Sequence, residues 1–147
     1  MKHTVIGVVV LLCLLCISFA VYERYAANTY TVLRETVDVH GVVVDGHTYT
    51  LKRQSKIRKL VMDTETYVIV MLKDDQEWAV LNLRSEFQEG ASEPTLTKNE
   101  PRRVEYSWRH SKVIVSLDEG VLRLAVTESD EELVGEMVGN TKVVPLR

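Results

Sequence analysis

Cysteine, proline and glycine are scarce in this sequence, with two, three and seven copies among 147 residues. Cys13 and Cys16 both lie in one apolar segment near the N-terminus, so the rest of the chain must fold without disulfides. A body of about 125 residues can do so, because folding buries roughly two thirds of the surface that the unfolded chain exposes. This scarcity excludes the small disulfide-dense scaffolds that are typical of secreted proteins.

The two cysteines carry no chemistry in our interpretation. In a helix, positions three apart share a face, where cysteine behaves as a small hydrophobic residue. Lipid attachment needs a small residue before the modified cysteine, whereas Leu12 and Leu15 precede these two. We therefore expect neither a metal-binding pair nor a lipoprotein.

A strong excess of charge of one sign is also lacking. The net charge is −3, with 27% charged, 46% hydrophobic and 7% aromatic residues. This composition is too apolar for a disordered chain and too charged for a protein with many membrane spans. A nucleic-acid-binding domain is normally clearly basic, so we expect no nucleic-acid partner.

One long segment is free of charge. Residues 5–22 contain no acidic or basic side chain. As a helix, this segment would be about 27 Å long, close to the ~30 Å hydrocarbon core of a bilayer. A core helix of a soluble protein would carry charges every few positions. The sequence therefore predicts that residues 5–22 enter a membrane.

Two fates of this segment are open. In the first, residues 1–24 remain as a single-pass anchor, with Tyr22 and Tyr25 in the interfacial aromatic belt. In the second, they form a signal peptide that is cleaved after Ala20, which would leave a periplasmic or secreted body. We favour the anchor. Lys2 and the amino terminus favour a cytoplasmic N-terminus, and residues 25–147 then form an extracytoplasmic β domain.

Beyond Tyr25 the hydrophobic pattern has a period of two, and turn residues recur at intervals of about 8–12 positions. Three hairpins are predicted, and each fixes which residues face each other. The first turns at Asp45-Gly46, with Val44 opposite His47 and Val42 opposite Tyr49. The second turns at Asp74-Asp75, with Met71 opposite Trp78. The third turns at Glu119-Gly120, with Val115 opposite Leu124. The second hairpin is apolar on both faces, which predicts interior strands that are covered on both sides.

Further strands are expected at 103–108, 133–138 and 142–146, and a long loop is expected at 85–101. A capping-box pattern at 129–132 makes a short helix the alternative to a strand there. Eight to ten strands in about 120 residues predict a single all-β domain, either an antiparallel β-sandwich or a small β-barrel. The pattern does not choose between the two.

Motifs for catalysis or cofactor binding are lacking. There is no phosphate-binding loop, nucleophile elbow or paired-histidine zinc motif. In the first hairpin, His40 and His47 would lie roughly 13 Å apart, too far to share a metal. Ser111 and His110 are neighbours on a strand, so they point to opposite faces.

An acidic run could ligate calcium only with alternating oxygen ligands, and this spacing is absent. The run consists of Glu128, Asp130, Glu131 and Glu132. We therefore expect no catalytic residue, no cofactor and no metal, and a hydrolase or metal enzyme that uses His110 or His47 is the weakest of the alternatives.

The most distinctive feature is a basic stretch on a chain of slightly negative net charge. It contains Lys52, Arg53, Lys56, Arg58 and Lys59, and no acidic residue occurs between Asp45 and Asp63. A local positive patch can meet an anionic surface or an acidic partner. Alternatively, these cations guard an exposed strand edge against pairing with other chains.

These features together predict a non-enzymatic β domain, anchored to the membrane, that binds a partner or belongs to an envelope assembly. The alternative is a secreted or periplasmic ligand-binding module cleaved after Ala20. The basic stretch is the candidate site for an anionic partner, and the membrane itself is the expected partner of residues 5–22.

Overall fold

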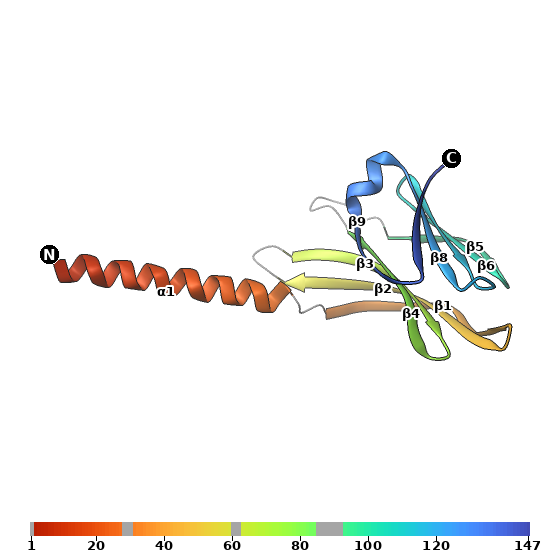
Figure 1. Cartoon of the computed structure of the whole chain (residues 1–147), viewed down its shortest axis with the longest axis horizontal. Helices are drawn as coiled ribbons and strands as arrows, with labels where there is room; N and C mark the ends of the chain where they lie inside the picture. Colours follow the sequence, from red (N-terminus) through yellow and green to blue (C-terminus); the bar gives the residue numbers. More distant parts are fainter. Residues whose placement is uncertain (1, 28–30, 60–62, 85–92) are drawn as a thin grey trace.

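The computed structural model describes residues 2–27, 31–59, 63–84 and 93–147. It begins with one long helix, α1 (Lys2–Ala27), which projects from a body of β-strands (Figure 1). Within α1, the span Thr4–Tyr22 has a mean hydropathy of 2.9, and none of it is buried against the body. The helix is long and apolar enough to cross a membrane or to act as a signal, and it continues three residues beyond the expected boundary at residue 24.

The first sheet has five strands in the order β1-β2-β3-β4-β9, all antiparallel to their neighbours. Its strands are β1 (Thr31–Val44), β2 (His47–Lys59), β3 (Asp63–Lys73), β4 (Gln76–Arg84) and β9 (Val134–Gly139). The first three are long, and their ends beside α1 extend beyond the second sheet (Figure 1).

The second sheet has the order β10-β8-β7-β6-β5. Its strands are β5 (Thr95–Glu100), β6 (Arg103–Trp108), β7 (Ser111–Ser116), β8 (Val121–Val126) and β10 (Thr141–Pro145). Strand β10 runs parallel to β8, whereas the other neighbours are antiparallel. The expectation of purely antiparallel sheets is therefore wrong at this edge, because the chain crosses from β9 to β10 between the two sheets rather than forming a hairpin.

The main apolar core contains side chains from both sheets. Leu51, Ile69 and Leu81 contribute from the first sheet, and Tyr106 and Leu124 from the second, all of them with no exposed surface. The period of two puts these residues on one side of each strand, as expected. Burial of this shared face is the main term that holds the two sheets together.

A smaller apolar cluster lies on the other face of the first sheet. It contains Val68, Val70 and Val80, with exposed fractions between 1% and 7%. Lys52 and Gln54 are the cross-strand partners of Val70 and Val68, and both are half-buried. The long side chains of β2 thus shelter the valines with their aliphatic stems.

The first hairpin has the predicted register, with Val44 opposite His47 and Val42 opposite Tyr49. The second differs by one residue, because a β-bulge at Glu77 and Trp78 places Met71 opposite Ala79 instead of Trp78. An extra residue in one strand shifts all later pairs by one.

The third hairpin differs by two residues. Val115 lies opposite Leu122 rather than Leu124, since the turn spans four residues, Leu117–Gly120, instead of two. A shift of two keeps the same side chains on the buried face. The predicted faces of β7 and β8 are therefore right although the predicted pairs are wrong.

The expected loop at 85–101 is only partly a loop. Residues 85–92 lie outside the described residues, and Thr95–Glu100 forms β5 at the edge of the second sheet. The capping-box region is a short 3-10 helix, η1 (Glu128–Leu133), which connects β8 with β9. The expected strand at 133–138 follows directly as β9, so the capping-box residues form a short helix and the strand prediction is confirmed after it.

Candidate functional site

The five residues of the basic stretch all lie on β2, between β1 and β3. A strand with neighbours on both sides has no free edge, so the interpretation of these cations as edge guards is wrong. Lys52 and Lys56 alternate with Arg53, which places them on opposite faces of the sheet. Arg58 and Lys59 are the last two residues of the strand, and we describe their backbone only.

Lys52 is neutralised by its own sheet. Its Nζ lies 3.1 Å from Glu35 Oε1, and Gln54 Nε2 donates to the other oxygen of Glu35 at 2.6 Å. The hydrogen bond from Gln54, followed by that from Lys52, lowers the pKa of Glu35. Lys52 therefore pairs with a neighbour on β1.

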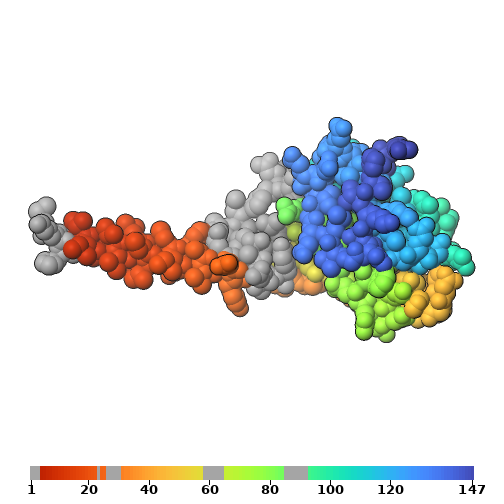
Figure 2. Space-filling model, in the orientation of Figure 1, coloured from red at the N-terminus to blue at the C-terminus, as the bar shows by residue number. Residues whose placement is uncertain are grey.

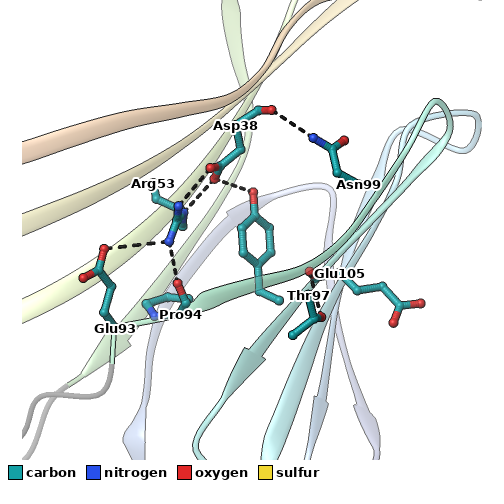
Figure 3. A network of polar contacts seen from close by, with 8 residues as sticks. Asp38, Arg53, Glu93, Pro94, Thr97, Asn99 and Glu105 are labelled. Carbon is teal, nitrogen blue, oxygen red and sulfur yellow. Dashed lines mark hydrogen bonds and ion pairs between the residues drawn. The ribbon is translucent and has the colours of Figure 1, made fainter.

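Arg53 is the centre of an inter-sheet polar cluster, which we define as Asp38, Arg53, Pro94, Asn99 and Tyr106 (Figure 3). Its Nε and Nη2 donate to the two carboxylate oxygens of Asp38 at 2.7 and 3.0 Å, and Nη1 donates to the carbonyl of Pro94 at 2.7 Å. The Asp38 side chain is 3% exposed and that of Arg53 19%. A two-point ion pair at this depth is among the stronger polar contacts in proteins.

The same carboxylate receives a third donor from the opposite sheet. Tyr106 Oη donates to Asp38 Oδ2 at 2.8 Å, and Asn99 Nδ2 donates to the Asp38 carbonyl at 3.4 Å. The inter-sheet polar cluster therefore joins β1 and β2 to β5 and β6.

The ionisation states in this cluster follow from its contacts. The hydrogen bond to Asp38 raises the pKa of Arg53, while burial and the bond to Asp38 raise that of Tyr106. The phenol thus stays protonated at any ordinary pH and does not act as a base. The arrangement connects the two layers of the body.

A shallow recess lies beside this cluster, between Arg53, Tyr67 and Glu93. Its volume is about 230 Å³ including open solvent, below the ~300–1,000 Å³ that small-molecule sites usually occupy. Arg34, which also lines the recess, forms an ion pair with Glu93 at 3.5 Å. The recess is therefore smaller than most small-molecule sites.

Lys56, Arg58 and Lys59 occupy the other part of the basic stretch. Among the residues that we describe, no carboxylate forms an ion pair with Lys56, which is half-buried. The end of β2 that carries these three cations lies beside the end of α1 (Figure 1), and Cα atoms of the two elements come within 8 Å. The structure thus separates the predicted patch into an internally paired part and a part next to the helix.

A second polar network surrounds Asp130 in η1, whose side chain is fully buried. Its Oδ2 accepts hydrogen bonds from the His110 N–H at 3.0 Å and from Ser111 Oγ at 2.9 Å. Its Oδ1 lies 3.2 Å from Arg109 Nε. Burial raises the pKa of Asp130, but the hydrogen bonds and the charge of Arg109 outweigh it, so the pKa lies below the usual 3.8.

This network contains a serine, a histidine and an aspartate, but it lacks the connections of a catalytic triad. Ser111 Oγ bonds to Asp130 and accepts the Thr127 N–H at 3.1 Å, whereas the His110 ring faces the same carboxylate at 3.6 Å and is 71% exposed. A nucleophile needs its base within hydrogen-bond reach. The network instead ties the β6–β7 turn to η1.

The remaining histidines lie apart. His40 is exposed, beside a register shift in β1, and His47 Nδ1 lies 2.7 Å from Asp74 Oδ2. The Thr48 N–H and the His47 ring lower the pKa of Asp74. In the described ranges, no three His, Cys, Asp or Glu side chains are grouped so that they could hold a metal ion.

Sequence reasoning missed Asp38, Tyr106 and Asp130 as members of polar networks. One signal was available for Arg53, since the alternation of β2 puts it on the buried side with Tyr49 and Leu51. A cation on a buried face needs a carboxylate nearby.

Comparison with known proteins adds no functional assignment. No protein-family model matches this sequence, and no curated protein and no solved structure shows significant similarity to it. The function must therefore be argued from the geometry described above.

Proposed function

We propose that this protein is a non-enzymatic, single-pass membrane protein whose extracytoplasmic β-sandwich domain binds a partner or forms part of an envelope assembly. The observation that carries the proposal is the exposure of α1. Its apolar side chains from Val5 to Tyr22 are 52–63% exposed, and none of the span is covered by the β body. On the face shown in Figure 2, the helix projects away from the β body. An apolar surface of this length is stable only in lipid.

The sandwich architecture is supported by the shared core. Two five-stranded sheets contribute opposing apolar faces to one cluster, and the inter-sheet polar cluster joins them at the β1 and β5 edges. In a closed barrel, these strands would continue one hydrogen-bonded ladder. The separate strand orders therefore favour two packed sheets.

A partner-binding role is supported by the opposite edges, β9 and β10. Met137, Val138 and Val143 are 39–46% exposed there, on strands that each have a single hydrogen-bonded neighbour. Edge strands with exposed apolar side chains are suited to the addition of a strand from another protein.

Orientation is inferred from the ends of α1. Lys2 and the amino terminus lie at one end, while Tyr22, Arg24 and Tyr25 lie at the other, where an interfacial belt is expected. The alternative function, a secreted or periplasmic ligand-binding module, requires cleavage after Ala20 and is separated by the mass of the mature protein.

Location and partner binding can be tested together, because the β body lacks cysteine. We would introduce Lys142→Cys on β10 and treat intact cells with a membrane-impermeant maleimide that carries a photoreactive group. The proposal expects labelling before lysis, an intact mass that includes residues 1–20, and a discrete cross-linked species after illumination. Labelling only after lysis contradicts the orientation, and loss of residues 1–20 selects the secreted alternative.

Two controls complete this experiment. His3→Cys, at the other end of α1, should react only after lysis. Lys98→Cys, on the β5 edge, should be labelled without forming the same cross-linked species. Equal cross-linking from both edges, or none from the Lys142→Cys variant, would show that the β10 edge is not the partner surface.

A further inference from the structure

We propose that the end of β2 that carries Lys56, Arg58 and Lys59 binds the anionic headgroups of the membrane that α1 crosses. The inference rests on the proposed function, in which α1 remains in the bilayer. It narrows the five-residue basic stretch to the three cations at the end of β2 that lies beside α1.

The first argument is that the other two cations of the basic stretch already have partners within the protein. Lys52 is bound to Glu35 and Arg53 to Asp38, both through oxygens on β1. Neutralised cations contribute little to the field outside the protein. The remaining positive charge of β2 therefore belongs to its last four residues, 56–59.

The position of these three cations next to α1 is the second argument for the proposal. The last residues of β2 lie beside the end of α1, where Cα atoms of the two elements come within 8 Å. Arg24, in the last turn of α1, adds a further cation at this level. The attraction of basic side chains to anionic lipid falls off within a Debye length, about 8–10 Å, so only groups at this end of the body can contribute.

The third argument is that exposed apolar side chains lie at the same end of the body. Val32 and Leu33, at the start of β1, are 47% and 58% exposed, and Tyr22 and Tyr25 lie in the last two turns of α1. A mixture of basic, aromatic and exposed aliphatic side chains is typical of surfaces that lie at the headgroup level.

At the α1 end, the three cations of β2 lie next to two acidic residues of β3, Asp63, which is the cross-strand partner of Lys59, and Glu65. The opposite end of the same sheet is acidic. Its two hairpin turns carry Asp45, Asp74 and Asp75, with Lys73 as a neighbouring cation. An anionic bilayer would attract one end of the long β1–β3 ribbon and repel the other. The β body is thereby held upright, with its acidic turns pointing away from the lipid.

The test uses the full chain in nanodiscs of phosphatidylcholine, with or without about 30% phosphatidylglycerol. Amide hydrogen exchange is measured for peptides that cover residues 54–66. We expect exchange to slow about threefold or more when the anionic lipid is present. The slowing should vanish at about 0.5 M NaCl, where the Debye length is only a few ångströms, and in the triple variant Lys56→Gln, Arg58→Gln and Lys59→Gln.

The matched control removes three cations from the second sheet, through Lys98→Gln, Lys112→Gln and Lys142→Gln, and should keep the slowing. Unchanged exchange in β6–β8 shows that each variant is folded. Equal exchange in the two lipids, or slowing that survives in the variant of residues 56–59, overturns the inference. A chain that fails to co-elute with nanodiscs of either composition overturns the anchor itself, so the two failures are distinct.

Discussion

The Arg53 side chain lies on the inward side of β2, where an unpaired cation would lose its hydration. Asp38 and the Pro94 carbonyl replace that water with fixed acceptors, and Tyr106 donates to the carboxylate from the opposite sheet. Breaking such a pair leaves one charge buried without a partner, which costs more than the pair itself contributes.

We predict that Asp38→Asn destabilises the protein by about 2–4 kcal/mol, because Arg53 keeps its charge and loses its counter-ion. Thermal unfolding of the full chain in detergent, followed by circular dichroism, measures the effect. Glu100→Gln is the control, since its ion pair with Lys98 is exposed and worth at most about 1 kcal/mol. A similar loss for both variants would mean that Asp38 acts by general charge alone.

At the same scale, the alternation of the expected strand at 103–108 accounts for the buried side chains of β6, namely Val104, Tyr106 and Trp108. It did not predict the partner of Arg53. Strand β1 has three register shifts, and each changes the face on which the following residues lie. Because Asp38 is the residue left unpaired at the shift between Val37 and Val39, its inward orientation cannot be read from a regular period of two.

The bulge in β4 shows the same limit at the scale of elements. The extra residue lets Trp78 turn away from Met71 and donate its Nε1–H to the Gly120 carbonyl at 2.8 Å. The centroid of its ring then lies 4.4 Å from Lys73 Nζ. Its backbone carbonyl accepts the Asn140 N–H, at the crossing between the sheets. This close approach requires glycine at position 139, because an added Cβ would lie 2.0 Å from the backbone carbonyl oxygen of Trp78.

We predict that Gly139→Ala destabilises the fold by at least about 2 kcal/mol, through a positive φ of 74° together with this clash. Gly46→Ala is the matched control. Gly46 has a φ of 80° but nothing within 4 Å of its added Cβ, so only the backbone strain of about 1 kcal/mol applies. Equal unfolding temperatures for the two variants would contradict the close approach at Trp78.

Turn chemistry determined how well each element could be predicted. Asp45-Gly46 fixes a two-residue turn, and the register of its hairpin is right. The segment before Gly120 fits two-residue and four-residue turns equally well, since both leave the same valines and leucines on the buried side. The parallel pairing of β10 with β8 depends on a crossing between sheets, which no local signal encodes.

For the whole molecule, the division into an apolar N-terminal segment and a β body could be read from the sequence, because hydropathy and period are local properties. The choice between two sheets and one closed ladder could not. It depends on which distant strands pair, such as β4 with β9. These two strands are separated in the sequence by all of β5–β8.

Stability of the whole fold should depend on pH through Asp130. Its folded pKa is lower than that of the unfolded chain, so the stabilisation is present above about pH 4 and is lost as the pH falls through the folded value. We predict a falling unfolding temperature below about pH 4. Asp130→Asn should be less stable at pH 7 and show a flatter acid limb, whereas Asp118→Asn, on an exposed turn, should follow the parent curve. Parallel curves for the parent and Asp130→Asn would assign the acid sensitivity elsewhere.

The partnership of β4 with β9 has a consequence for biogenesis. Strand β9 is synthesised only after all of β5–β8, so the first sheet is completed by a strand that begins some fifty residues after β4 ends. The second sheet is completed only by β10. Neither layer is complete until the chain has been synthesised almost to its last strand. The body therefore closes in one late step, with its unpaired edges exposed until then.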